Sequence, residues 1–328
     1  MTTFFATLTP MLTLFLCIAV GFVSSKAKLL PENAGKTMAK METWIFCPAL
    51  SFMTMARFCT VSSLTVHGTN VTMAAISVAI SMAIAIPLSK VFVKEPGMER
   101  GVYSYALAFA NSGYIGDPIV LALFGEEALA YYKLYCLPLS IVIYTWGISV
   151  LSPGGSGGSV WKRLVNAPTV AMLLGVAVGL TNTFGFLPDF VTSALDSLKA
   201  CMGPVAMLLA GVTIARYDFL GMLKKKKVYI ATALRLIVIP TVLIAALYGL
   251  KTAANTVLDM NIGNDVLFLC FFSTAAPLGL NTVVFPEAYG GSPETGASMT
   301  MISHTLCVIT IPLLYAVMVS LFGAPFGG

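Results

Sequence analysis

About ten apolar segments, each close to 20 residues long, recur along this chain of 328 residues and limit its fold more than any other feature. A helix needs roughly 20 apolar residues to cross a hydrocarbon core about 30 Å thick. The pattern therefore predicts an all-α integral membrane protein with about ten transmembrane helices. The predicted spans are 4–23, 41–56, 71–93, 102–123, 129–151, 165–184, 190–215, 228–250, 266–289 and 297–321.

The composition leaves little chain for anything outside a membrane. Hydrophobic residues make up 58% of the chain, charged residues make up 10%, and the mean hydropathy is +0.89, whereas soluble domains carry about 25% charged residues. A water-soluble fold is excluded. The net charge of +5 does not indicate a nucleic-acid partner, because lysine and arginine first set the orientation of a membrane protein.

Lysine and arginine gather in the connections that follow spans one, three, five and seven. Because cytoplasmic loops carry an excess of these residues, the odd-numbered connections are predicted to be cytoplasmic, and both termini extracytoplasmic. The ninth connection departs from this pattern. It is predicted to be cytoplasmic by its number, but it contains Glu294 and no basic residue. The cluster Lys224–Lys227 could bind anionic lipid headgroups, although a topology anchor at a span boundary is the preferred interpretation.

Two halves of five spans each would enter the membrane from opposite sides, which is the condition for an inverted repeat. Residues 1–151 form the first predicted repeat, 152–162 a short cytoplasmic linker rich in glycine and serine, and 163–328 the second repeat. Each half has a proline in its second apolar run, at Pro48 and Pro204. Such repeats are typical of secondary transporters, so the halves together are expected to form one transporter domain.

Spans four and nine are each interrupted by helix-breaking residues. Span four contains Asn111-Ser112-Gly113-Tyr114-Ile115-Gly116-Asp117-Pro118, and span nine contains Ala276-Pro277-Leu278-Gly279-Leu280-Asn281. Glycine and proline weaken helical backbone, so both spans are predicted to unwind near the membrane midplane. Backbone freed from helical hydrogen bonds persists there only where protein or a wet cavity satisfies it.

Two broken helices at corresponding positions of two halves indicate the binding site of a transporter. The N-termini of the half-helices present free N–H groups and the positive end of a helix dipole, which suits an anion. The alternative is that these glycines and prolines serve packing or kinks and bind nothing. A matched pair, with an asparagine at each break, favours the binding site.

On these two motifs, together with Tyr289-Gly290-Gly291, the sequence resembles the auxin efflux carrier family, within the wider group of bile acid and sodium symporters. Bacterial members of the family are mostly assigned to the transport of organic acids such as malonate. The resemblance implies a 5+5 inverted repeat with broken, crossing helices 4 and 9, and a substrate carboxylate bound beside the crossover. It also implies elevator-like motion and often a homodimer. The crossover asparagines of the family fall on Asn111 and Asn281.

Three features depart from the family pattern. Cys47 precedes Pro48 where an asparagine is common, which removes a polar group from the expected pocket. Asp117 stands where an apolar residue is usual. The linker between spans five and six is short, so regulation through that loop is not expected.

The expected substrate-binding residues are Asn111, Gly113, Asp117, Pro277 and Asn281. Asparagine amides can bind an anion and still release it, because they carry no charge to desolvate, or they can simply satisfy the broken backbone of their own helices. Asp117 precedes a proline, a pair typical of N-cap and N1 positions, so a helix cap is the preferred interpretation. An ionisable group at membrane depth is also a candidate for carrying a proton or binding a cation.

The candidates for proton or ion coupling are Asp117, Glu287 and His304. A lone histidine in a membrane helix more often makes one interhelical hydrogen bond. Arg235 could balance the charge of an anion, or it could snorkel toward the cytoplasm.

The expected function is secondary active transport of small organic anions, such as malate, malonate or auxin-like acids, across the cell membrane by alternating access. Membrane lipids surround the chain, and a proton is preferred over Na⁺ as the coupling ion. No enzymatic activity, cofactor or metal is expected, because paired carboxylates are missing and the seven cysteines have neither CxxC spacing nor a histidine at ligand spacing. The alternatives are a membrane-embedded ligand sensor or channel, and a sodium-coupled symporter of the same fold.

Overall fold

The computed structural model describes residues 2–151, 166–217, 221, 226–283 and 294–326. Within these residues the secondary structure is helical, and the only β-type pairing is an isolated antiparallel bridge between Ala110 and Leu278. The predicted all-α class is confirmed. The predicted linker at 152–162 and the coupling candidate Glu287 lie outside the described residues.

The helical elements alternate between long apolar helices and short turns that interrupt them. Among the described residues, η1, η3, η4 and η6 are single turns of π-helix, a form that is rare and often found at functional sites. In chain order the elements are α1 (Thr2–Lys26), α2 (Ala34–Met41), η1 (Glu42–Phe46), α3 (Cys47–Phe58), η2 (Val61–Ser63), α4 (Leu64–Phe92), α5 (Met98–Ala108), η3 (Ser112–Gly116), α6 (Asp117–Tyr135), α7 (Leu137–Val142), η4 (Ile143–Gly147), α8 (Ile148–Leu151), α10 (Ala167–Leu180), η5 (Phe184–Phe186), α11 (Asp189–Ala215), α13 (Lys226–Ala233), η6 (Leu234–Val238), α14 (Ile239–Val257), α15 (Asp265–Ala275) and α17 (Glu294–Phe322).

Within the described residues, five helical stretches are long and apolar enough to cross a membrane, and up to six if a bent pair, Ser112–Tyr135 with Leu137–Leu151, counts as one span. Helices also occupy the other predicted segments, but there they are short or interrupted, as α3, α10 and α15 are. Ten full spans arranged as an inverted repeat therefore stay a prediction. The five stretches are Leu8–Lys26, Gly68–Phe92, Asp189–Ala215, Lys226–Val257 and Glu294–Phe322.

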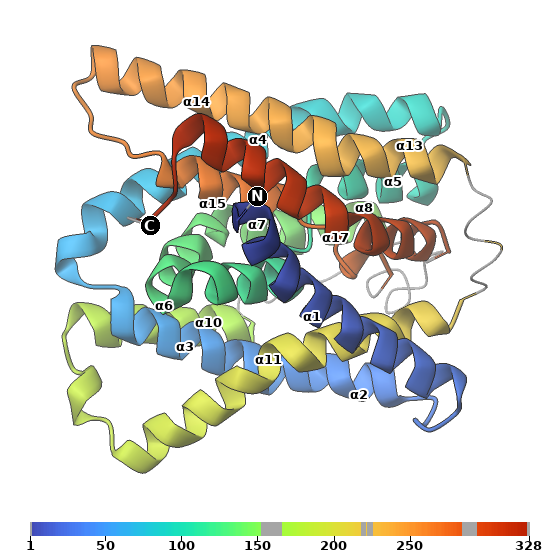
Figure 1. Cartoon of the computed structure of the whole chain (residues 1–328), viewed down its shortest axis with the longest axis horizontal. Helices are drawn as coiled ribbons and strands as arrows, with labels where there is room; N and C mark the ends of the chain where they lie inside the picture. The colour runs from blue at the N-terminus through green and yellow to red at the C-terminus, as the bar shows by residue number, and fades with distance from the viewer. Residues whose placement is uncertain (1, 152–165, 218–220, 222–225, 284–293, 327–328) are drawn as a thin grey trace.

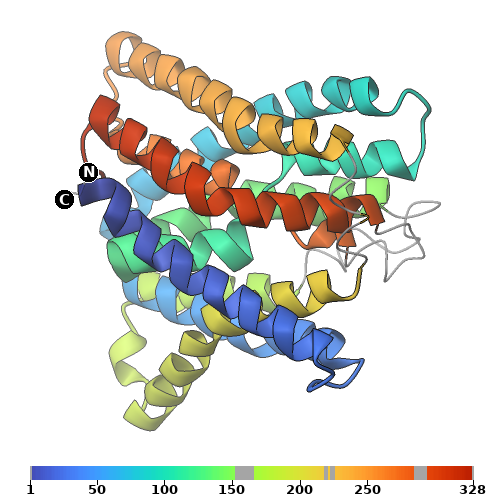
Figure 2. The same cartoon turned by 45° about the vertical axis from the view of Figure 1, so that its right-hand side comes forward.

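The helices pack as two groups. The first helix group consists of α1, α2, η1, α3, α10 and α11, and the second consists of α4 to α8 with α13 to α17. Figures 1 and 2 show α3, α10 and α11 on the lower side of the molecule, with α4, α13 and α14 on the upper side. The two groups touch where α1 meets α17, where α3 meets α6 and where α11 meets η3.

The helix α15 forms the centre of the second group. Each residue from Val266 to Phe272 is at most 3% exposed. A helix that is apolar on every face must be buried on every face, and α15 is surrounded by α4, α6, α14 and α17. The break that follows α15 is therefore held inside the second group rather than at its surface.

Two glycines bring α1 and α11 of the first group into close contact. A Cβ atom added at Gly211 would lie 2.0 Å from the carbonyl oxygen of Ile18, and one added at Gly21 would lie 2.2 Å from that of Leu208. Small residues let membrane helices approach closely, because the contact between helices is then made by backbone atoms. The glycines thus make the first helix group a compact unit.

Replacing Gly211 with alanine should destabilise the protein, because the added methyl group would push α1 and α11 apart. Overpacking costs about 1–3 kcal/mol, which corresponds to a fall of about 5 °C in melting temperature. The matched control is Gly249→Ala in α14, where no atom lies within 4 Å of the added Cβ. Thermal unfolding of the purified protein should separate the two variants, and equal melting temperatures would contradict this packing.

Candidate functional site

The two broken helices meet each other at their breaks. α5 ends at Ala108, and α15 ends at Ala275. The extended residues that follow form the antiparallel bridge between Ala110 and Leu278, in which the Asn111 N–H donates to the Pro277 carbonyl at 2.7 Å. This hydrogen bond therefore pairs a backbone N–H of the first break with a backbone carbonyl of the second, two groups that no longer have a partner within a helix. The predicted unwinding of both segments is confirmed in the described residues.

Asn111 caps the helix that restarts after the first break. Its Oδ1 atom accepts a hydrogen bond from the Tyr114 N–H at 3.2 Å, which makes it the side-chain cap of η3. Its Nδ2 atom is buried and has no hydrogen-bond partner among the described residues. Asn111 also lines a cavity, so this amide is a candidate donor to a ligand.

The other predicted binding residues divide between the cavity and its support. Asn281 lines the cavity, and its Nδ2 atom donates to the Tyr105 hydroxyl at 3.0 Å. Gly113 also lines the cavity, and a Cβ added there would meet no atom within 4 Å. Pro277 is not among the lining residues; its carbonyl instead holds Asn111 in place.

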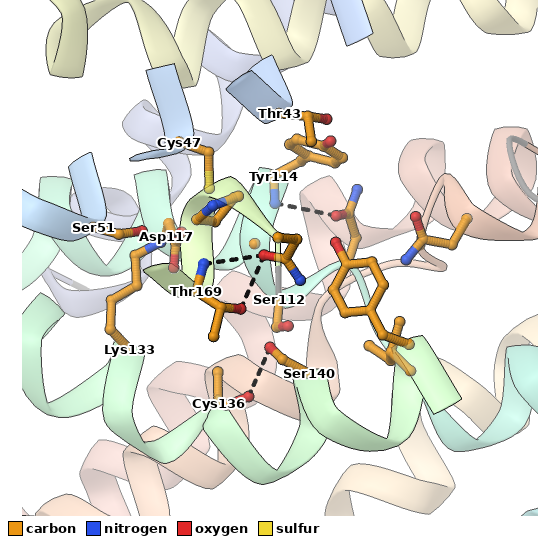
Figure 3. A pocket seen from close by; sticks show the side chains of 18 of the residues that line it. Thr43, Cys47, Ser51, Ser112, Tyr114, Asp117, Lys133, Cys136, Ser140 and Thr169 are labelled. Carbon is orange, nitrogen blue, oxygen red and sulfur yellow. Dashed lines mark hydrogen bonds and ion pairs between the residues drawn. The ribbon is translucent and has the colours of Figure 1, made fainter. Parts of the chain in front are cut away.

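The cavity encloses about 160 Å³ and lies between the two helix groups. Figure 3 shows side chains of both groups converging on it. The first group contributes Thr43, Cys47 and Ser51, whereas the second contributes polar side chains around the break of span four. The polar lining residues are Thr43, Ser51, Asn111, Ser112, Tyr114, Asp117, Lys133, Ser140, Tyr144, Asn166, Thr169 and Asn281.

A reversal at Gly125 brings two charged residues together in this cavity. Gly125 has φ +81°, a conformation that favours glycine, and the chain of α6 turns back there. The Tyr132 hydroxyl on the returning arm lies 3.1 Å from the Ser112 carbonyl oxygen and 3.2 Å from that of Phe272. Lys133 consequently forms an ion pair with Asp117, and their side chains are 10% and 2% exposed.

The preferred interpretation of Asp117 as a helix cap is wrong. The helix restarts earlier, as the π-turn η3, so Asp117 has helical dihedral angles and its carboxylate binds Lys133 instead. Asn111 supplies the cap. Sequence reasoning gave Lys133 no role at the site. Gly125 lies midway between the two residues in the sequence and indicates a break, but it does not indicate which way the chain turns.

The remaining predicted residues lie away from the cavity or outside the described residues. His304 in α17 is 1% exposed, and its Nδ1 atom lies 2.6 Å from the Thr300 carbonyl oxygen. Arg235 in η6 is also 1% exposed, and its guanidinium has no hydrogen-bond partner among the described residues. The interpretation that Arg235 snorkels toward the cytoplasm is therefore wrong.

Sequence reasoning also missed Glu42, the first residue of η1. Glu42 is 0% exposed, and neither of its carboxyl oxygens has a hydrogen-bond partner among the described residues. The residue stands next to Thr43, which lines the cavity. A glutamate flanked by Lys40 and Trp44 resembles a residue at a membrane boundary, so its burial is not visible in the sequence.

A second cavity, of about 660 Å³, is larger than the first but suits an anion less well. Glu127 and Asp265 both line it, and no lysine or arginine does. Their negative charges would repel a carboxylate. No group of three or more potential metal ligands occurs in the part of the chain that the structure describes.

Comparison with known proteins decides the family. A family model described as membrane transport protein matches residues 6–315. The chain belongs to this family of transporters. The predicted membership of the auxin efflux carrier family is thereby confirmed, and the family is one of transporters rather than enzymes.

Two archaeal relatives of this membrane transport protein are described only as uncharacterized transporters. The one from Methanothermobacter thermautotrophicus is 22% identical over 208 residues, which cover 62% of this chain and 66% of the relative. The one from Methanocaldococcus jannaschii is 21% identical over 224 residues, which cover 62% of this chain and 68% of the relative. The match thus spans just under two thirds of the first relative's length.

The buried pair of Asp117 and Lys133 predicts non-additive effects in this transport protein. Asp117→Asn or Lys133→Met alone should lower the free energy of unfolding by about 3–5 kcal/mol, because each leaves a buried charge without its partner. The double variant should lose less than the sum of the two. Denaturant unfolding of all four proteins measures this coupling, and additive losses would show that the pair does not form.

Proposed function

We propose that this protein is a secondary active transporter of small organic anions that works by alternating access. The observation that carries the proposal is the position of the smaller cavity. It lies between two helix groups, at the contact between two broken helices, and it is lined by Asn111, whose Nδ2 atom has no hydrogen-bond partner among the described residues. A ligand held there would contact both groups, so relative motion of the groups could expose it to either side.

The chemistry of the cavity favours a carboxylate. Asn111 offers a free N–H donor, and the first backbone N–H groups of η3 point away from their own helix, as at every helix N-terminus. Ser51 and Ser112 add hydroxyl groups to the lining. The hydroxyls of Thr43, Ser140 and Thr169 already donate within the protein, to Ala39, Cys136 and Asn166. The charge of Lys133 is largely balanced by Asp117, so the site can hold an anion without binding it too tightly to release it.

The size of the cavity favours small acids over large ones. An engineered protein cavity of about 150 Å³ accommodates benzene, and the volume here is about 160 Å³. Malonate and malate are of that size class. An indole-based acid of the auxin type would need the two helix groups to separate further, so we propose short-chain carboxylates as the substrates.

An ionic cluster that joins the two helix groups supports an elevator-like motion. Glu126 of the second group pairs with Arg57 and Lys199 of the first group, at 3.1 Å and 2.6 Å. Glu126 and Arg57 are about 30% exposed, and ion pairs that reach solvent contribute only about 0–1 kcal/mol. Such contacts can be broken and formed again in each transport cycle.

The orientation and assembly follow the sequence predictions as proposals. The protein would lie in the cell membrane with both termini outside, and the family resemblance favours a homodimer. A proton is the preferred coupling ion. The two alternatives are a sodium-coupled symporter, which would need a sodium gradient for uptake, and a sensor or channel, which would show no saturable uptake.

Uptake by reconstituted protein tests the substrate site. In liposomes, Asn111→Ala and Asn281→Ala should each lower the saturable uptake of radiolabelled malonate or malate about tenfold or more, because a lost hydrogen bond to an anion costs about 1.5–3 kcal/mol. Asn261→Ala is the control, since Asn261 is exposed and lines only the second cavity. Equal uptake by all variants would place the site elsewhere, and a wild type without saturable uptake would favour the sensor or channel.

Cross-linking tests the relative motion of the helix groups. In a background without the seven native cysteines, cysteines at positions 126 and 199 join the two groups, whereas cysteines at positions 57 and 196 join α3 to α11 within the first group. A short thiol cross-linker should abolish uptake by the first pair and leave uptake by the second pair unchanged. Full uptake by both cross-linked proteins would contradict an elevator-like motion.

A further inference from the structure

We infer that Glu42 carries the proton that crosses the membrane together with the anion. This inference rests on the proposed transport function. It assigns the coupling ion to a residue that lies behind the wall of the cavity and belongs to the first helix group.

Glu42 combines complete burial with a complete lack of partners. Its side chain is 0% exposed, and neither Oε1 nor Oε2 has a hydrogen-bond partner among the described residues. The residues after it face the cavity, since Thr43 and Cys47 both line it. The carboxyl group thus lies next to the site but does not contact the ligand space.

An ionised carboxylate in this position would be strongly disfavoured. A buried charge must be paired or hydrogen-bonded, and a carboxyl group without either takes up a proton instead. The other two carboxyl groups in this region differ from Glu42, because Asp117 pairs with Lys133 and Glu126 pairs with Arg57 and Lys199. Glu42 is therefore protonated in the conformation observed.

The charged and titratable groups around Glu42 leave it without a counter-ion. Lys133 on α6 is the cation whose charge acts on Glu42, but it is bound to Asp117. Tyr114 on η3 and Cys47 on α3 are the other titratable groups within range of its charge. On α11, Asp196 and Lys199 belong to the ionic cluster and Cys201 is exposed. On α2, Lys36 and Lys40 are exposed, and α10 has no titratable residue.

This arrangement links the proton to the anion by charge. With Glu42 protonated, Asp117 and Lys133 cancel, and the cavity is neutral toward an entering carboxylate. With Glu42 ionised, the same region carries one net negative charge that repels the anion. The anion is thus bound best when Glu42 holds a proton.

Glu42 can release its proton because it and its neighbours belong to different helix groups. Glu42 belongs to the first helix group, whereas Lys133 and Tyr114 belong to the second. When the second group moves, these neighbours leave and water can reach the carboxyl group. Glu42 then passes its proton to water on the far side, becoming a carboxylate, as the anion departs. Asp117 cannot serve in this way, because it and Lys133 lie on the same element and move together.

The test uses radiolabelled malonate, proteoliposomes and a pH gradient. With the membrane voltage held at zero by valinomycin and equal potassium, one proton per anion permits about tenfold accumulation for about one pH unit. The wild type should accumulate malonate on the alkaline side. Glu42→Gln should keep exchange of malonate between equal pools within about twofold but lose the accumulation, and Glu42→Asp should restore it.

Glu127→Gln is the matched control, because Glu127 is an exposed carboxylate away from the first cavity. Accumulation by Glu42→Gln equal to that of the wild type would overturn the inference. A wild type that exchanges malonate but never accumulates it with the pH gradient would also overturn the inference, while leaving anion transport intact. A folded wild type that neither exchanges nor accumulates any of the small carboxylates would overturn the proposed function itself.

Discussion

The backbone contact between the two broken helices is the constraint on which the rest of the site depends. Two helices end inside this membrane protein, and the bridge between Ala110 and Leu278, with its hydrogen bond from Asn111 to Pro277, pairs part of the backbone that they leave free. Asn111 is fixed by its backbone N–H and its capping Oδ1 atom, and its remaining Nδ2 donor has no partner among the described residues. The break that weakens the helix thus supplies the donor that we propose binds the anion.

The fold-back at Gly125 adds the electrostatic part of the site. It returns α6 to the break, places Tyr132 against the carbonyl oxygens of Ser112 and Phe272, and pairs Lys133 with Asp117. The result is a polar cavity with almost no net charge of its own. In such a cavity a proton on Glu42 would remove a net negative charge that repels an anion, which is why we propose that a residue behind the wall controls binding.

Much of this site could be predicted from the sequence, because helix breaks are local features. Gly113, Pro277 and the asparagines beside them indicated both breaks. The pair of Asp117 and Lys133 could not be predicted, because it depends on which way the chain turns after Gly125. Glu42 could not be recognised either, since its burial is caused by the packing of α10 and α11 against η1 within the first helix group. The number of full spans was also harder to predict, because breaks shorten several helices.

The central claim is that the anion binds between the two helix groups at the contact of the broken helices. A cryo-electron microscopy map of the protein in lipid nanodiscs with saturating malonate tests it most directly. We expect added density within hydrogen-bond distance of the Asn111 Nδ2 atom and beside Asn281. Density in the larger cavity lined by Asn70, Glu127 and Asp265, with the crossover empty, would contradict it.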